Sequence, residues 1–300
     1  MADTLKDFRS LPVDYQDLLR LAEEKFEISI KPLQLLVGGF SGAAVFLVSV
    51  TYHKDSHVEH LILKLDHKGS HSKNDEWTRH KILVRNASKA FLDQNLPDLA
   101  FERVETESSI AIFYSIAGQS LLNFQPLSKF THQAQLETIF NETNKVLLTK
   151  WNANPEISQA VHPRTVIERW LGFRLDTGRN IEGFIRLNTH RDPEIPGFLI
   201  EGDVFPNPLF YARSGEPWGS CRPIDIVTGS IHGDLNTNNI LVNFSDGRLD
   251  GYYLIDFALF KEDMPLFYDQ RYLEMSYLLR SLSPSNFSTI IELVKLIADG

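Results

Sequence analysis

Three oxygen-bearing side chains that could support phosphate chemistry fall within residues 232–256. Asp234 and Asn239 lie on a predicted loop, and Asp256 follows a predicted strand. A predicted hairpin that turns at Asp246–Gly247 would return Asp256 to the side of Asn239. Carboxylate and amide oxygens suit a hard cation such as Mg²⁺, whose other positions are filled by water and phosphate. The stretch therefore predicts a metal-dependent phosphate site next to a rigid sheet.

The order of these side chains matches the phosphoryl-transfer template. In that template an Asp accepts the proton of the substrate hydroxyl, an Asn follows five residues later, and a metal-binding Asp comes after the next hairpin. The alternative is that Asp234 and Asn239 cap a turn and Asp256 only ends a strand, since these residue types favour such places.

A glycine-rich turn lies near the start of the chain, where phosphate could approach the backbone. Residues 38–42 read Gly-Gly-Phe-Ser-Gly and fall between predicted strands over 33–37 and 43–51. Glycines let phosphate oxygens reach backbone N–H groups because no Cβ stands in the way. The alternative is a plain hairpin turn.

A lysine and a glutamate further along could pair. Lys64 lies in a predicted apolar strand over 57–66, where burying its charge is costly without a partner. Glu76, near the start of a predicted helix over 74–94, is the candidate partner, and Asp75 is the other nearby acid. The alternatives are an outward lysine on an edge strand and an acid that only favours the helix dipole.

The combined motifs resemble a known family. HGDxxxxN followed by Ile255-Asp256-Phe257-Ala258 is similar to the aminoglycoside phosphotransferase and choline kinase branch of the protein-kinase-like superfamily. Within that branch it most resembles the bacterial kinases called ternary-complex-associated domains. The resemblance implies an α+β, bilobal protein-kinase-like fold. Residues 1–117 would form the nucleotide-binding N-lobe, an antiparallel sheet plus helix. Residues 118–300 would form a larger, mainly helical C-lobe that carries the catalytic hairpin, the acceptor site and a loop-rich insertion over 176–227.

The resemblance also assigns roles to residues. It implies ATP and Mg²⁺ as cofactors and transfer of the γ-phosphoryl group to a hydroxyl acceptor. ATP would be bound by Gly38, Gly39, Phe40, Ser41, Gly42, Lys64, Glu76 and the hinge residue Ala117, catalysis would involve Asp234, Asn239 and Asp256, and the metal would be held by Asn239 and Asp256. His232 is expected to hold the loop by hydrogen bonds. Asp269 is expected to brace the loop from behind or, equally, to act as a helix N-terminal acid.

The stretch after Asp256 favours a small-molecule acceptor over a protein. A regulated protein kinase has a long activation segment and an Ala-Pro-Glu anchor there, and neither is visible before the helix predicted from about Phe267. Two alternatives stay open. One is a catalytically weak nucleotide-binding sensor or scaffold within a larger bacterial signalling or conflict-system protein. The other is an aminoglycoside-type antibiotic phosphotransferase.

Composition limits the partners. The chain has 300 residues, a formal net charge of −9 and one cysteine, Cys221. Its acidity argues against nucleic acid as the main partner, because phosphate backbones need clustered Lys and Arg. A single cysteine excludes an intrachain disulfide and favours a cytoplasmic protein. The sequence shows no signal peptide and no membrane-length apolar run, and the resemblance allows for fused or associated signalling domains.

The remaining elements are predicted from periodicity. Helices are expected over 15–26, 127–151, 163–173 and 290–298, a hairpin over 99–105 and 109–115, and one short strand over 198–200.

Overall fold

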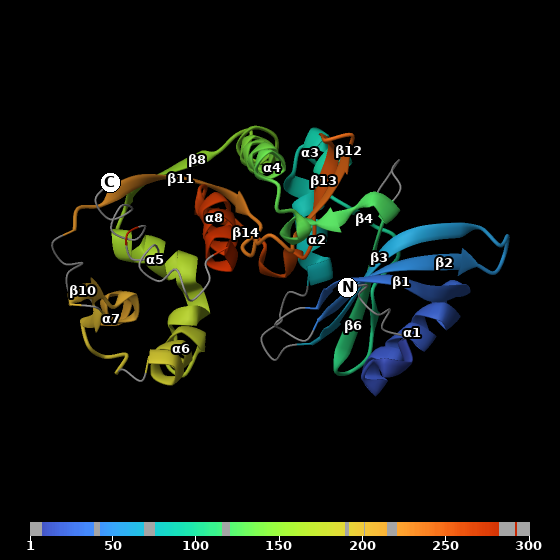
Figure 1. Cartoon of the computed structure of the whole chain (residues 1–300), viewed down its shortest axis with the longest axis horizontal. Helices are drawn as coiled ribbons and strands as arrows, with labels where there is room; N and C mark the ends of the chain where they lie inside the picture. Colours follow the sequence, from blue (N-terminus) through green and yellow to red (C-terminus); the bar gives the residue numbers. More distant parts are fainter. Residues whose placement is uncertain are drawn as a thin grey trace. The chain divides into compact units, whose positions relative to one another are not determined.

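The computed structural model describes residues 8–38, 43–68, 76–115, 121–189, 192–200, 202–214, 221–281 and 292. Antiparallel sheets alternate with helices along the chain, which confirms the predicted α+β class (Figure 1). The structure does not describe residues 39–42 or Ala117, which were predicted to bind nucleotide. Of the helix predicted over 290–298, it describes only residue 292. In the described part of the chain, no helix has both the length and the apolar character needed to cross a bilayer.

The first sheet is antiparallel and follows the predicted strands. Its order is β1-β2-β3-β6-β4, and β5 also pairs with β6. The strands are β1 (Ile28–Gly38), β2 (Ala44–Tyr52), β3 (Val58–His67), β4 (Asp98–Leu99), β5 (Val104–Glu105) and β6 (Ser109–Ser115). The strand predicted over 99–105 is thus two separate short pairings with β6, a correction to the predicted hairpin.

Alternation along β3 gives the sheet two different faces. Leu61, Leu63 and Leu65 are fully buried in one cluster with helix α1 (Val13–Phe26), which lies along the sheet in Figure 1. Ile62 and Lys64 point to the opposite face, because successive strand residues alternate. The apolar stripe of α1 therefore covers one face, and the other face is left for the predicted site.

The helix predicted over 74–94 is two helices. Helix α2 (Glu76–Asn86) ends before Ser88, and α3 (Lys89–Asn95) begins after it. The Ser88 hydroxyl accepts a hydrogen bond from the Phe91 N–H at 3.3 Å, as an N-cap residue does. Apolar periodicity continues across this break, which is why the pattern alone predicted one helix.

The hairpin predicted after Asn239 is present and lies between two apolar clusters. It consists of β12 (Ile240–Ser245) and β13 (Arg248–Leu254), and β7 (Gln125–Pro126) pairs with its outer edge. Asp246 and Gly247 both have positive φ, 50° and 76°, as a tight hairpin turn of the right twist requires. Alternate hairpin residues enter different cores: Ile240, Val242, Tyr252 and Leu254 on one side, and Leu241 and Tyr253 on the other.

The helices beside this hairpin are shorter than predicted. The stretch over 127–151 contains a 3₁₀ turn at Leu127–Lys129, then α4 (Gln133–Val146), then a π-helical turn at Leu147–Trp151. Helix α8 (Tyr268–Ser281) agrees with the helix predicted from about Phe267. Side chains from α4 and α8, including Leu136, Ile139 and Leu273, share one buried core with the hairpin.

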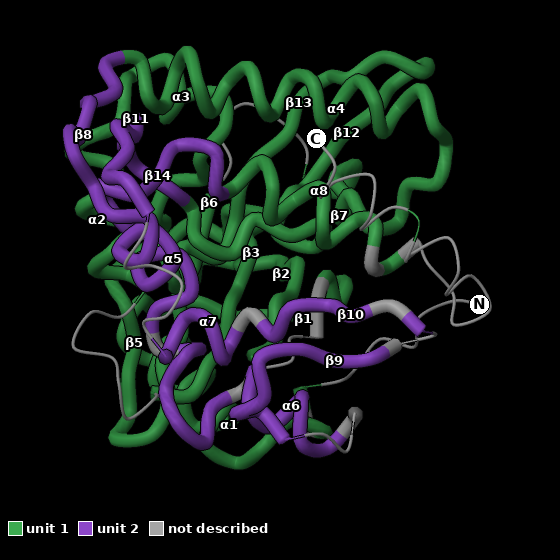
Figure 2. Tube along the Cα trace, turned by 90° about the vertical axis from the view of Figure 1, so that its left-hand side faces the viewer, with its two compact units in different colours: residues 1–153, 232–260, 269–300 green, residues 154–231, 261–268 purple. Residues whose placement is uncertain are grey.

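The chain divides into two compact units, coloured green and purple in Figure 2. Unit 1 comprises residues 1–153, 232–260 and 269–300, and unit 2 comprises residues 154–231 and 261–268. Unit 2 contains a three-stranded sheet in the order β14-β11-β8 and a β9–β10 hairpin. Its elements are β8 (Glu156–Val161), α5 (Pro163–Leu171), α6 (Asn180–Thr189), β9 (Gly197–Ile200), β10 (Asp203–Pro206), α7 (Pro208–Ser214), β11 (Ile224–Ile231) and β14 (Lys261–Pro265).

The insertion over 176–227 is more regular than its prolines and glycines predicted. It holds two helices and a hairpin in place of one short strand. Pro208 is the first residue of α7, a position where proline starts a helix because its missing N–H would be unpaired there anyway. The lobe boundary predicted between residues 117 and 118 lies in an undescribed stretch and stays a prediction.

Candidate active site

Lys64 is the centre of a buried ionic cluster. Its Nζ lies 2.5 Å from Glu76 Oε2, 2.7 Å from Asp256 Oδ1 and 3.7 Å from Asp66 Oδ2. The lysine side chain is only 3% exposed. The contact expected between Lys64 and Glu76 is therefore present, and Asp256 joins it from 192 positions along the chain. Strand β3 supplies Lys64 and Asp66, helix α2 supplies Glu76, and Asp256 follows the hairpin.

The cluster holds the Lys64 amine charged. Burial by itself would lower the pKa of this lysine, because it penalises the ammonium form. The attraction of Asp256 and then of Glu76 outweighs burial and raises the Lys64 pKa. Burial likewise acts to raise the pKa of Asp256, but the Lys64 charge and hydrogen bond prevail and lower it. Both groups are therefore ionised at neutral pH.

The Glu76 carboxylate is fixed through both of its oxygens. Oε2 takes the lysine, while Oε1 accepts hydrogen bonds from the Tyr114 hydroxyl at 2.7 Å and from the Phe257 N–H at 3.2 Å. Glu76 is 6% exposed, and its burial raises its pKa against the opposing pull of Lys64. This carboxylate thus joins α2 to β3, to β6 and to the residue after Asp256.

The loop that carries Asp234 is held on two sides. The His232 ring donates from Nε2 to the Ile255 carbonyl at 2.9 Å, and its Nδ1 accepts from the Asp234 N–H at 3.3 Å. Asp269, near the start of α8, accepts from the backbone N–H groups of His232 at 2.6 Å and Gly233 at 3.0 Å. His232 thus holds the loop as expected. Asp269 braces it from behind, the first of the two alternatives.

Gly233 is required by the geometry of this loop. Its φ is +81°, a region that favours glycine, and a Cβ built there would overlap the Leu259 carbonyl oxygen and carbon. The close approach of the loop to the residues after Asp256 therefore depends on the missing side chain. This explains the glycine between His232 and Asp234 in physical terms.

Asp234 and Asn239 meet at the base of the hairpin. The Asn239 amide nitrogen donates to the Asp234 carbonyl at 2.8 Å and lies 3.4 Å from the Asp234 carboxylate. The Asn239 carbonyl accepts the Ile255 N–H at 3.0 Å, which brings Asn239 beside the residue that precedes Asp256. Asn236 shapes the same loop, since its side-chain oxygen accepts the Asn238 N–H at 2.9 Å.

Asn239 and Asp256 form a donor set that fits Mg²⁺. One supplies an amide oxygen and the other a carboxylate oxygen, the hard ligands that Mg²⁺ takes in small number beside water and phosphate. The side-chain nitrogen of Asn239 donates a hydrogen bond to the Asp234 carbonyl, so the side-chain oxygen is the atom that would bind a cation. Among the described residues, no group of three or more His, Cys, Asp or Glu is arranged to hold a metal.

Residues 186–300 match the family model described as Ternary complex associated domain 9. This match covers less than half of the chain. No curated protein matches the sequence closely enough to count as a relative.

Two solved structures show a distant likeness. One is a thermostable mutant of the aminoglycoside phosphotransferase APH(4)-Ia in a ternary complex with AMP-PNP and hygromycin B, at 14% identity and a TM-score of 0.46, covering 84% of this chain and 74% of that one. The other is the spectinomycin phosphotransferase APH(9)-Ia with ADP and spectinomycin, at 15% identity and a TM-score of 0.40, covering 85% and 71%. Scores this low carry no argument about activity.

Sequence reasoning found some members of the cluster and missed others. Lys64, Glu76 and Asp256 touch directly, and Asp234 and Asn239 share one loop beside them. Of the predicted glycine turn only Gly38 is described, as the last residue of β1. Asp66 was missed, although strand alternation puts it on the same face as Lys64. Tyr114 was also missed, and no sequence pattern marks it.

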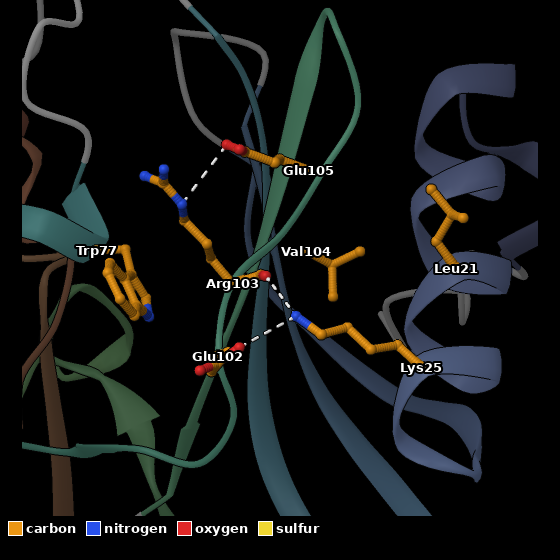
Figure 3. A pocket seen from close by; sticks show the side chains of 7 residues that line it. All are labelled: Leu21, Lys25, Trp77, Glu102, Arg103, Val104 and Glu105. Carbon is orange, nitrogen blue, oxygen red and sulfur yellow. Dashed lines mark hydrogen bonds and ion pairs between the residues drawn. The ribbon is translucent and has the colours of Figure 1, made fainter.

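A separate hollow lies beside the Trp77 ring. It has a volume of about 510 Å³ and is lined by Leu21, Lys25, Trp77, Glu102, Arg103, Val104 and Glu105 (Figure 3). Its charged side chains pair with each other: Lys25 with Glu102 at 3.4 Å and Arg103 with Glu105 at 3.5 Å. None of the residues of the ionic cluster lines the hollow.

Proposed function

We propose that this chain transfers the γ-phosphoryl group of ATP to a hydroxyl group, in a reaction that requires Mg²⁺. The observation that carries the proposal is the buried contact of Lys64 with both Glu76 and Asp256, at 2.5 and 2.7 Å. A folded chain buries a lysine between two carboxylates at a cost in desolvation, and such perturbed ionic clusters occur preferentially at functional sites.

Each residue of the cluster has a task in such a reaction. Lys64 would neutralise the α and β phosphates, and Glu76 would hold Lys64 in position. Asp234, on the loop fixed by His232 and Asp269, would orient the acceptor hydroxyl and take its proton late. Asn239 and Asp256 would hold Mg²⁺, which would supply positive charge beside the transferred group.

The acceptor is proposed to be a small molecule. Only the 3₁₀ turn Phe257–Leu259 and the short strand β14 (Lys261–Pro265) separate Asp256 from α8. A protein kinase positions its peptide substrate with a longer ordered segment at this point. Antibiotics with hydroxyl groups are one class to screen, and resistance conferred on a susceptible host is the readout for that class.

The deciding experiment measures ATP turnover by the full chain with and without Mg²⁺, against a panel of hydroxyl compounds. Asp256→Asn should lower Mg²⁺-dependent turnover by orders of magnitude, because it removes the only negative charge of the donor set formed by Asn239 and Asp256. Asp234→Ala should lower turnover similarly while nucleotide still binds. Nucleotide binding without turnover in the wild type would instead favour a sensor or scaffold.

A matched control is available in the same hairpin. Asp246→Asn makes the same chemical change at the turn, where φ is 50° and Asn is well tolerated. It should leave turnover unchanged and melt at the same temperature as the wild type. Equal turnover in Asp256→Asn and Asp246→Asn would remove Asp256 from the metal site.

A further inference from the structure

Tyr114 is a buried polar residue to which no task has been assigned so far. It lies on β6, opposite Ile62 on β3, and is 2% exposed. Ile62 and Lys64 share one face of β3, so Tyr114 reaches the ionic cluster from the neighbouring strand. Its hydroxyl donates to Glu76 Oε1 at 2.7 Å.

The two Glu76 oxygens have different donors, and this fixes the rotation of the carboxylate. Oε2 accepts a hydrogen bond from the Lys64 amine, and Oε1 accepts hydrogen bonds from the Tyr114 hydroxyl and the Phe257 N–H. Hydrogen bonds to a charged acceptor are stronger than neutral ones, and a buried acceptor without its donor is costly. Without the Tyr114 hydroxyl, Oε1 would keep only the donor that belongs to the residue after Asp256.

This matters because Asp256 and Lys64 must separate during the proposed reaction. The Lys64 amine lies 2.7 Å from Asp256 Oδ1 in the structure. If Lys64 binds phosphate and Asp256 helps to hold the metal, Glu76 becomes the main protein group that fixes the lysine. If Glu76 Oε1 were held only by the Phe257 N–H, the glutamate would shift together with Asp256. Tyr114 instead belongs to the six-stranded sheet.

We propose that Tyr114 is a positioning residue for phosphoryl transfer: its hydroxyl locks the Glu76 carboxylate, and through Glu76 it holds Lys64 where the nucleotide phosphates bind. The inference rests on the proposed function. Tyr114 touches neither nucleotide nor acceptor in this role. Its effect on the reaction passes entirely through Glu76, and this makes the role measurable.

The first test is Tyr114→Phe in the full chain. The ring is retained, so its packing against His80, at 5.4 Å between ring centroids, is preserved. Loss of one hydrogen bond to a charged group should lower kcat roughly tenfold to a hundredfold, while KM for ATP changes less than about threefold. A purely structural hydroxyl would instead lower the melting temperature and leave kcat per folded molecule at the wild-type value, which would overturn the proposal.

Tyr52 offers a matched control. Its hydroxyl donates to Glu59 at 2.9 Å in the same sheet, away from the ionic cluster. Tyr52→Phe removes a tyrosine–glutamate hydrogen bond of the same kind and should leave kcat and KM unchanged. An equal fall in kcat for both variants would mean that the sheet responds generally to such losses, and Tyr114 would lose its special role.

A double-mutant cycle tests the route through Glu76. In a Glu76→Gln background, adding Tyr114→Phe should lower kcat by less than about twofold, because the group on which the hydroxyl acts is already changed. A full additive loss would overturn the proposal. Failure of the proposed function gives a different result. The wild type itself would then show no turnover, whether or not it binds a fluorescent ATP analogue.

Discussion

At the residue scale, the ionic cluster carries an excess of negative charge. One ammonium, Lys64, faces the carboxylates of Glu76, Asp256 and, more distantly, Asp66. Burial raises the pKa of Glu76 and of Asp66, which reduces the cost of that excess. A bound nucleotide phosphate would add further negative charge, so a divalent cation is the natural counterweight. In the proposed reaction, we therefore expect a metal–nucleotide complex to bind in preference to free nucleotide.

His80 links stability to pH at the same scale. The ring is fully buried between Tyr114 and Phe257, and burial lowers its pKa to about 4, against a weak opposing pull from the Pro97 carbonyl. The unfolded chain binds a proton near pH 6.5, but the folded ring does not until about pH 4. Its contribution to the free energy of unfolding is therefore complete above pH 6.5 and is lost as pH falls towards 4.

The expected result is a different pH dependence in His80→Leu. Between pH 7.5 and pH 5 the wild type should lose about 2 kcal/mol more unfolding free energy than the variant, because only the wild type has this group to protonate. Urea unfolding at the two pH values measures the difference. His132→Gln, at an exposed position, controls for the loss of a histidine as such. Parallel losses in wild type and His80→Leu would show that this ring is not the source.

At the scale of elements, the loop that carries Asp234 depends on one close approach, between Gly233 and Leu259. Gly233 and Gly247 both have positive φ, +81° and +76°, yet only Gly233 faces a backbone carbonyl where a Cβ would be. Gly247→Ala should cost about 1 kcal/mol of stability, from the left-handed conformation alone. Gly233→Ala should cost more than about 3 kcal/mol, or displace the loop and abolish turnover, because strain and overlap add.

Thermal unfolding and turnover of the two variants separate these effects. The pair is matched, since both changes add one methyl group at a left-handed glycine of unit 1. If the two variants had equal stability and equal turnover, then Leu259 would be able to move away at no cost. The loop would then not be fixed by this contact.

Much of this element-scale arrangement follows from sequence, and the exceptions have physical causes. The β2, β3 and β12–β13 strands were predictable because short apolar runs mark them, together with an Asp-Gly turn between β12 and β13. The break between α2 and α3 was not, since a single Ser88 side chain makes it while apolar periodicity continues. The contacts of Tyr114 and Asp269 with distant partners were beyond any local pattern, because sheet order and loop path decide them.

At the scale of the whole molecule, the chain passes from unit 1 into unit 2 and back twice. Unit 2 contains a cluster of ionic hydrogen bonds of its own, centred on Glu182. Glu182 on α6 is 6% exposed and accepts hydrogen bonds from the Gly178 N–H at 3.1 Å, Arg186 at 3.0 Å and Arg213 at 2.9 Å. The Gly178 N–H, followed by the two arginines, lowers the Glu182 pKa to about 2. Arg213, on α7, also donates to the Leu175 carbonyl at 2.8 Å. One carboxylate thus ties together segments that the sequence predicted as loop.

Removing this anchor should loosen unit 2 by itself. In Glu182→Ala, amide hydrogen exchange should speed up roughly tenfold in peptides from α6 and α7, because two arginines and a backbone N–H lose their shared acceptor. Exchange in β1, β2 and β3 should stay at the wild-type rate, since those strands belong to the other compact unit. Glu168→Ala is the control, because it removes an exposed pair with Arg164 that contributes little. Faster exchange in the first sheet as well would mean that the two units open as one, and unchanged exchange in α6 and α7 would mean that Glu182 does not anchor them.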